Sequence, residues 1–220
     1  MSRGIAIEWP GGRVSGRLAG SGGTGILLAH GAGTNQDHSF MVLLRDGLAA
    51  TGHTVLTFNY PYAERGARRP DPTERLLECH RAAADHLATQ ANRVFLAGRS
   101  MGGRIGTYLA ATGYPTAGLI LYAYPLHPAG KPERLRIDQF ADISAPMLFF
   151  QGTRDALARM DLFQAHIGSL PGVEVEILEG ASHSTRGGGW TEASMSGHLV
   201  ERTTTWVRAV SSGKPSRSRP

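Results

Sequence analysis

The chain has 220 residues, of which 41% are hydrophobic and 19% are charged, and this balance is typical of one globular domain. No apolar run approaches the about 20 residues that cross a bilayer. The N-terminal residues contain no apolar signal-peptide region, so we expect a cytoplasmic protein without a membrane partner. Cations of the last ten residues supply much of the net charge of +5, so the body has too little charge to predict nucleic-acid binding.

The apolar segments alternate along the chain between strand-like and helical patterns. Short runs rich in apolar and β-branched residues predict strands over 4–9, 13–19, 25–29, 54–60, 93–98, 118–123, 146–152 and 173–178. Apolar residues at helical spacing predict helices through Phe40, Leu44 and Leu48, over 73–88, from Ser100 onward, and near 157–168 and 192–210.

This alternation predicts an α/β domain with a mainly parallel sheet and helices on both faces. Ligands of such sheets bind at the carboxyl ends of the strands, so the residues just after each strand are the most informative. We expect the domain to span 1–210 and the basic residues 211–220 to be a disordered tail. The single cysteine, Cys79, excludes an internal disulfide and lies on the apolar face of its helix, where we expect a buried thiol.

The segment "VFLAGRSMGGR", residues 94–104, places a serine between glycines at the end of a buried strand. Residues 98–102 match the pattern G-x-S-x-G in the strand–turn–helix context of a nucleophile elbow. Gly98 and Gly102 lack a Cβ, which lets the neighbouring chain approach closely in a tight turn. Ser100 then lies at a helix N-terminus, where free N–H groups favour developing negative charge. The alternative is a plain tight turn with a solvated serine.

A serine hydroxyl needs a base to become a nucleophile, and the base needs a group that orients it. Asp155 follows the strand over 146–152 and His183 follows the last strand, so both are expected at the same sheet edge as Ser100. The order Ser, Asp, His is the one expected after such an elbow. Asp155 is also a candidate N-cap of the next helix. The competing acids are Asp138 and Asp161.

Acyl transfer by such a serine also needs two N–H donors for the negatively charged oxygen, an oxyanion hole. One expected donor is the amide of Met101, the residue after the serine. The other should come from "HGAG", residues 30–33, whose glycines let the backbone turn its amides toward a substrate. We expect Ala32 to donate, with Gly31 as the alternative, and we expect His30 to brace this loop by hydrogen bonds.

The stretch from Tyr124 to Ala145 is too short for a lid domain, so we expect a loop, one short helix and an open, shallow pocket. Candidate substrate contacts on this edge are Tyr60, Tyr62, Arg99 and His127, with ordinary loop packing as the alternative. An arginine also stands beside each candidate catalytic residue: Arg99, Arg154 and Arg186. One hypothesis is that this edge is electropositive and favours a substrate with a carboxylate or phosphate. The alternative is that these are ordinary solvated arginines at the surface.

With this elbow, loop and residue order, the chain from about 25 to 210 resembles the α/β-hydrolase superfamily. Within it, the chain resembles small lidless members near the dienelactone-hydrolase branch. It resembles more closely the hydrolase-like domain shared by a testis-expressed protein and a subunit of a chromatin acetyltransferase complex. The segments that carry this closer resemblance are "LAHGAGTNQDH", "FNYPYAERGARRPD", "LAGRSMGGR" and "YPLHPAGKPERLR".

The resemblance implies the α/β-hydrolase fold, a triad of Ser100, Asp155 and His183, and a hydrolase. Dienelactone hydrolases use a cysteine nucleophile, so the serine here argues against that particular chemistry. We therefore expect a serine hydrolase that cleaves a small ester or thioester through an acyl-enzyme and needs no metal or organic cofactor. The alternative is a non-catalytic module of the same fold that binds a protein partner, because a fold does not fix an activity.

Overall fold

The computed structural model describes residues 2–213, and within them eight strands form one sheet in the order β1-β2-β4-β3-β5-β6-β7-β8. The strands are β1 (Arg3–Trp9), β2 (Gly12–Ala19), β3 (Thr24–Ala29), β4 (Thr54–Phe58), β5 (Arg93–Arg99), β6 (Gly118–Tyr122), β7 (Met147–Arg154) and β8 (Val173–Ser182). β2 pairs antiparallel with β1 and β4, whereas the other neighbouring strands are parallel. The predicted N-terminal hairpin and mainly parallel sheet are confirmed.

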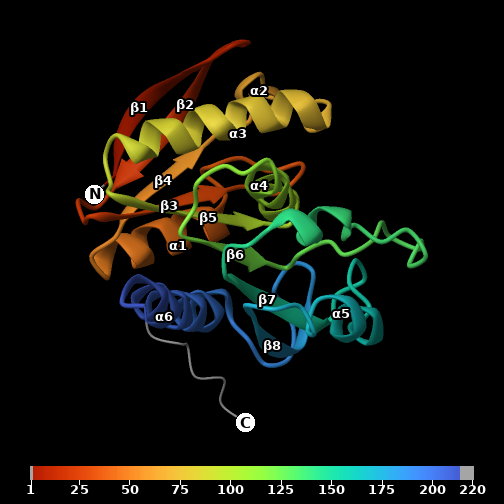
Figure 1. Cartoon of the computed structure of the whole chain (residues 1–220). Coiled ribbons are helices and arrows are strands. Elements are labelled where there is room, and N and C mark those ends of the chain that lie inside the picture. Colours follow the sequence, from red (N-terminus) through yellow and green to blue (C-terminus); the bar gives the residue numbers. More distant parts are fainter. Residues whose placement is uncertain (1, 214–220) are drawn as a thin grey trace.

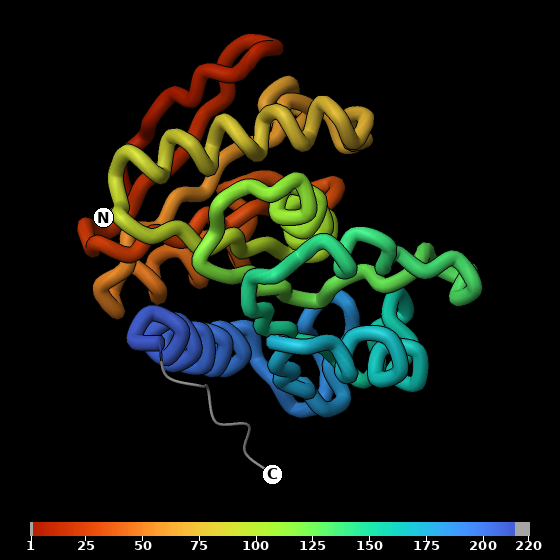
Figure 2. Tube along the Cα trace, viewed as in Figure 1, coloured from red at the N-terminus to blue at the C-terminus, as the bar shows by residue number. Residues whose placement is uncertain are grey.

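Helices cover both faces of the sheet, as Figure 1 shows. The helices are α1 (Ser39–Ala50), α2 (Pro61–Glu64), α3 (Thr73–Ala88), α4 (Met101–Ala111), α5 (Met160–His166) and α6 (Glu192–Ser211), with a short 3-10 helix η1 (Asp138–Asp142). α1 and α6 pack together on one face, and α3 and α4 lie on the other. Figure 2 shows that the β1–β2 hairpin and β8 lie at opposite edges of this layered structure.

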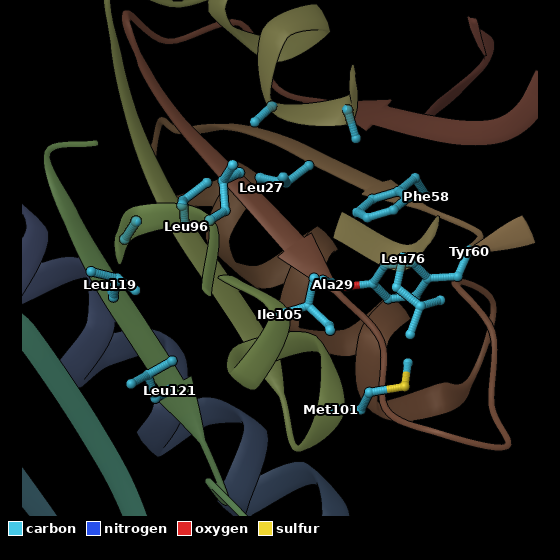
Figure 3. Close-up of a cluster of buried hydrophobic side chains, with 14 of the residues drawn as sticks. Leu27, Ala29, Phe58, Tyr60, Leu76, Leu96, Met101, Ile105, Leu119 and Leu121 are labelled. Atoms are coloured by element: carbon cyan, nitrogen blue, oxygen red, sulfur yellow. The ribbon is translucent and has the colours of Figure 1, made fainter. Parts of the chain in front are cut away.

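Burial follows from the position of each strand in this three-layer arrangement. Every residue of β4 and β6 is buried, because helices cover both faces of the central strands. β1 at the edge instead carries several exposed residues. The close-up in Figure 3 shows the cluster on the α3 and α4 side, where Leu27, Leu96 and Ile105 from three different elements meet. Continuous apolar runs in the sequence therefore mark the centre of the sheet.

Some details differ from the sequence-based expectation. The short helix α2 was not predicted, because four residues are too few to show helical periodicity, although Pro61 at its first position is a favourable helix start. β8 extends to Ser182, directly before His183, with an irregularity in its pairing between Gly152 and Arg154. Between β6 and β7 the chain forms only η1 and loops, in agreement with the expected absence of a lid domain.

At the C-terminus, α6 ends at Ser211, one residue beyond the expected helix. Most of the predicted tail, residues 214–220, lies outside the described residues.

Cys79 is fully buried, as expected, and burial raises the pKa of its thiol to about 12. A thiol with such a pKa is inert as a nucleophile. Among the helices of residues 2–213, none has the length and apolar character needed to cross a membrane.

Candidate active site

The tight turn between β5 and α4 holds Ser100 in a strained conformation. Its φ of 51° lies in the left-handed region that residues with a side chain rarely adopt. The Ser100 amide donates to the Tyr122 carbonyl over 2.9 Å, and its carbonyl accepts from the Arg104 amide over 3.1 Å. A Cβ on Gly102 would lie 2.3 Å from the Ala29 carbonyl oxygen, so only glycine fits there. The backbone therefore forms the tight strand–turn–helix geometry that the sequence pattern predicts.

His183 lies between Ser100 and Asp155 and hydrogen-bonds both. Its Nε2 is 2.9 Å from Ser100 Oγ, and its Nδ1 is 2.9 and 3.0 Å from the two carboxylate oxygens of Asp155. A carboxylate only accepts, so Nδ1 carries the proton and donates a hydrogen bond to Asp155. The lone pair on Nε2 then accepts the hydrogen bond of the serine hydroxyl. The three predicted residues, which are far apart in the sequence, form one hydrogen-bonded chain.

The carboxylate of Asp155 is fully buried and accepts hydrogen bonds at both oxygens. Besides His183, the amide of Leu157 donates to Oδ1 over 2.8 Å, and Gln151 Nε2 donates to Oδ2 over 2.8 Å. The Leu157 contact closes a local turn and is not a helix cap: α5 begins later, at Met160 with Arg159 as its N-cap, so the expectation that Asp155 caps the next helix is wrong. Gln151 was missed by the sequence reading, although a lone polar residue in the apolar strand "MLFFQG" is a usable signal.

The competing acids lie apart from this chain of hydrogen bonds. Asp161 is exposed and pairs with Arg159 next to it, and Asp138 begins η1. Neither carboxylate contacts His183 within the described part of the chain. The structure therefore leaves Asp155 as the acid beside this histidine.

The loop of residues 30–33 lies against the elbow, since a Cβ on Gly31 would be 3.6 Å from Ser100 Cβ. The Gly31 carbonyl accepts hydrogen bonds from three donors, which are His30 Nδ1 at 2.9 Å, Thr34 Oγ1 at 2.9 Å and Tyr62 Oη at 3.2 Å. All peptide bonds of this loop are trans, so the Ala32 N–H points away from that carbonyl. The three donors thereby fix the direction of the Ala32 amide.

His30 braces this loop as predicted. Its Nε2 accepts from the Tyr60 amide over 3.1 Å while Nδ1 donates to the Gly31 carbonyl. Burial lowers the pKa of His30 to about 4, so the ring is neutral and has one donor and one acceptor. The other expected donor, the Met101 amide, is the first of α4 and has no partner within the helix.

Three of the four expected substrate contacts are buried in the protein instead of lining a pocket. Tyr60 and Tyr62 are fully buried, and Figure 3 shows Tyr60 inside the core cluster with Phe58. His127 is 2% exposed, accepts from the Arg159 amide at Nε2 and contacts the Pro128 carbonyl at Nδ1. These residues follow strands that end at the same sheet edge as the strand before Ser100, but their side chains pack inward and are not exposed to a substrate, contrary to the expectation.

The fourth expected contact, Arg99, lines a cavity of about 230 Å³ beside the elbow. Arg99 is the last residue of β5 and its guanidinium lies 5.0 Å from the centre of the Phe40 ring. Side chains of β5 alternate between the two faces, which places Arg99 on the face that α1 and α6 cover.

Two buried neutral histidines predict that acid destabilises the fold. Burial lowers the pKa of His30 to about 4 and that of His80, which hydrogen-bonds Tyr60 Oη, to about 3, from an ordinary 6.5. Their stabilising effect is complete above pH 6.5 and is lost as the pH falls toward these values. We expect each of these two histidines to lower the free energy of unfolding by about 2 kcal/mol when the pH falls from 7.5 to 5.

Urea denaturation at both pH values measures this loss. His80→Gln should remove about half of the difference between pH 7.5 and pH 5. An unfolding free energy that stays constant over this range would contradict the prediction.

Solved structures of known proteins share this arrangement of elements. A serine hydrolase homologue from Coxiella burnetii is 21% identical, with a TM-score of 0.70, over 91% of this chain and 96% of the other. A serine hydrolase without a lid from Xanthomonas campestris is 20% identical, with a TM-score of 0.71, and the match covers 99% of this chain and 97% of the other. A dienelactone hydrolase from Anabaena variabilis is 18% identical, with a TM-score of 0.72, and the match covers 94% of this chain and 97% of the other. At these identities the likeness shows the fold.

The family is shown by a match over most of the chain. The closer resemblance to the domain of a testis-expressed protein and a chromatin acetyltransferase-complex subunit is not tested by these comparisons and stays a prediction. A model of the alpha/beta hydrolase domain matches residues 23–210, and the chain therefore belongs to the α/β-hydrolase family.

Proposed function

We propose that this protein is a serine hydrolase that cleaves a small ester or thioester through an acyl-enzyme. The observation that carries the proposal is the position of His183, whose two ring nitrogens lie 2.9 Å from Ser100 Oγ and 2.9 Å from Asp155 Oδ2. These distances are within hydrogen-bond reach for a nucleophile, its base and the group that orients the base.

Each residue of the proposed mechanism has one role. His183 Nε2 takes the proton of Ser100 as the serine oxygen attacks the carbonyl carbon, and it then gives this proton to the leaving group. Asp155 keeps the proton of His183 on Nδ1 and stabilises the imidazolium. Water, activated by the same histidine, then attacks the acyl-enzyme and releases the acid.

The negative oxygen of the tetrahedral intermediate is held by backbone amides in this proposal. Met101 donates from the helix N-terminus, and Ala32 donates from the loop whose Gly31 carbonyl is fixed by three hydrogen bonds. Donors that are fixed before the reaction need no rearrangement when charge develops, and one such donor contributes about 3 kcal/mol to the transition state.

The proposed substrate size rests on the connection between β6 and β7. That connection forms only η1 and loops, so no lid domain encloses a long acyl chain. The lidless relative from Xanthomonas campestris is described as a serine hydrolase, which agrees with an open site of this kind. A short ester or thioester is therefore the substrate class that we propose.

A fluorophosphonate probe tests the proposed nucleophile directly, because an activated serine displaces fluoride from phosphorus and stays labelled. We expect labelling of the wild-type protein and its loss in both Ser100→Ala and His183→Ala. Ser169→Ala, which removes an exposed serine away from the site, is the matched control and should label normally. Labelling is read by gel fluorescence or intact mass.

The same experiment distinguishes the proposed hydrolase from the alternative function, a non-catalytic binding module. If the folded wild-type protein is not labelled, the serine is not activated, and a non-catalytic module that binds a protein partner becomes the better interpretation. Labelling that persists in His183→Ala would instead contradict the role of this histidine as the base.

A further inference from the structure

A cavity of about 230 Å³ lies where the start of α1, the start of α6 and the turn after β8 meet. Its lining residues are His38, Phe40, Arg99, Ser184, Thr185, Arg186, Glu192, Met195 and Ser196. Two of them adjoin the proposed catalytic residues in the chain, because Arg99 precedes Ser100 and Ser184 follows His183. Ser100 and His183 are not themselves in this lining, but each has a chain neighbour in it, so the cavity lies next to the proposed catalytic residues.

Two arginines line this cavity without an anionic partner. Among residues 2–213, neither Arg99 nor Arg186 forms a side-chain hydrogen bond or an ion pair, and Arg99 Nε is buried with no acceptor. Burial and the charge of Arg186 lower the pKa of Arg99, and the nearby Asp155 carboxylate opposes this shift only in part. A buried donor without an acceptor and two neighbouring like charges both cost free energy that a bound anion would recover.

The surrounding structure holds the side chain of Arg99 and the backbone of Arg186. The Arg99 guanidinium packs on the Phe40 ring, with its central carbon 5.0 Å from the ring centre. Arg186 is an exposed residue, but its carbonyl accepts from the Ser182 amide over 2.8 Å, which places its backbone in a tight turn at the rim of the cavity. Arg99 therefore supplies a preorganised cation, and Arg186 supplies a second one from the rim.

The other charged groups of the wall do not neutralise the pair. Glu192 hydrogen-bonds Ser39 and lies in the first turn of α6, where a carboxylate is stabilised by the helix N-terminus. Burial and the two arginines lower the pKa of His38, and Glu192 opposes them. The two arginines and one glutamate give the lining one excess positive charge, and the Asp155 carboxylate acts on Arg99 from outside the lining, so the cavity matches a monoanion better than a dianion.

We propose that this cavity binds a carboxylate on the substrate, so that the enzyme prefers small esters that carry an acid group at the end opposite the scissile bond. The catalytic consequence rests on the proposed hydrolase function, whereas the binding itself does not. Of the three arginines that flank the catalytic positions in the sequence, only Arg99 and Arg186 line the cavity; Arg154 is exposed elsewhere on β7.

Binding is tested first without catalysis. Ser100→Ala protein is titrated with monoethyl glutarate and with ethyl pentanoate, its neutral equivalent of the same length, and the melting temperature is followed. We expect stabilisation by the acid ester alone, and loss of that stabilisation in the double variant Ser100→Ala/Arg186→Gln. Equal responses to the two esters, or an unchanged response in the double variant, would overturn the proposal.

The kinetic test uses two pairs of esters, since the acid group can lie on either side of the ester bond. Monoethyl glutarate is compared with ethyl pentanoate, and 4-acetoxybutyrate with butyl acetate, by kcat/KM at low salt. We expect a preference for the acid in at least one pair, and Arg186→Gln should lower that preference about tenfold, the effect of one charge-assisted hydrogen bond. Arg154→Gln, the matched control outside the cavity, should keep the wild-type preference.

The two tests separate the two proposals. If neutral esters are hydrolysed and the preference is absent or insensitive to Arg186→Gln, the cavity proposal fails and the hydrolase proposal stands. If no ester is hydrolysed but the acid ester still stabilises Ser100→Ala through Arg186, the hydrolase proposal fails and the anion site stands.

Discussion

Replacing Asp155 with asparagine should lower kcat on a short-chain ester by about 10⁴-fold with little change in KM. The asparagine amide can donate a hydrogen bond to His183 Nδ1, which would shift the imidazole proton to Nε2. A protonated Nε2 on a neutral ring cannot accept the proton of Ser100, so the base is lost although the geometry is kept. Steady-state kinetics on a panel of short esters measures this loss.

Asp161→Asn is the matched control for this prediction. Asp161 is exposed and pairs with Arg159, so removing its charge should leave kcat within about twofold, because exposed ion pairs contribute little. Circular dichroism and urea denaturation show whether Asp155→Asn is folded, since the amide also replaces an acceptor of Gln151 and Leu157. A folded Asp155→Asn variant with wild-type kcat would contradict the proposed role of the carboxylate.

The residues beside Ser100 could be predicted because the sheet topology brings strand ends together. Asp155 and His183 each follow a parallel strand, and parallel strands place their carboxyl ends at one edge. The candidate acid and base could thus be chosen by position without any knowledge of side-chain packing. Their catalytic roles rest on the experiments above.

The direction in which loop side chains point could not be predicted. Tyr60 and His127 follow strands just as Asp155 does, yet Tyr60 packs inward to hydrogen-bond His80 on α3, and His127 packs against the loop before α5. These contacts depend on how helices and loops dock on the sheet, which a strand pattern does not report. The family resemblance likewise did not point to Gln151, which donates from β7 to Asp155 in the following loop; its only signal was that it is a polar residue in an apolar strand.

The arginines show the same limit on a smaller scale. Arg99, Arg154 and Arg186 look alike in the sequence, because the first two directly precede a candidate catalytic residue and the third follows His183 by three residues. Alternation of side chains along β5 places Arg99 on the face that α1 and α6 cover. The turn after His183 places Arg186 at the same cavity, whereas Arg154 remains exposed at the end of β7. A charge pattern therefore indicates a site only after the backbone shows which side chains converge.

Gly102→Ala should lower the free energy of unfolding by about 4 kcal/mol or more, or prevent folding. A Cβ at this position would lie 2.3 Å from the Ala29 carbonyl oxygen, 2.6 Å from its carbon and 2.7 Å from the His30 carbonyl oxygen. All three are backbone atoms at the end of β3, so no side-chain rotation relieves the overlap. Relief requires α4 to move away from β3, which also displaces Ser100 from His183.

Gly106→Ala separates this steric effect from the general effect of alanine in a helix. It lies one turn later in α4, and the nearest atoms to its Cβ would be two of the His80 ring at 3.7 and 3.8 Å and Leu96 Cβ at 3.8 Å, which are ordinary contacts. Alanine is a better helix former than glycine, so Gly106→Ala should be neutral or more stable by up to about 1 kcal/mol. Urea denaturation of both variants measures the difference. Equal stability of the two would show that the close approach of α4 to β3, and with it the strained elbow at Ser100, is not required by the fold.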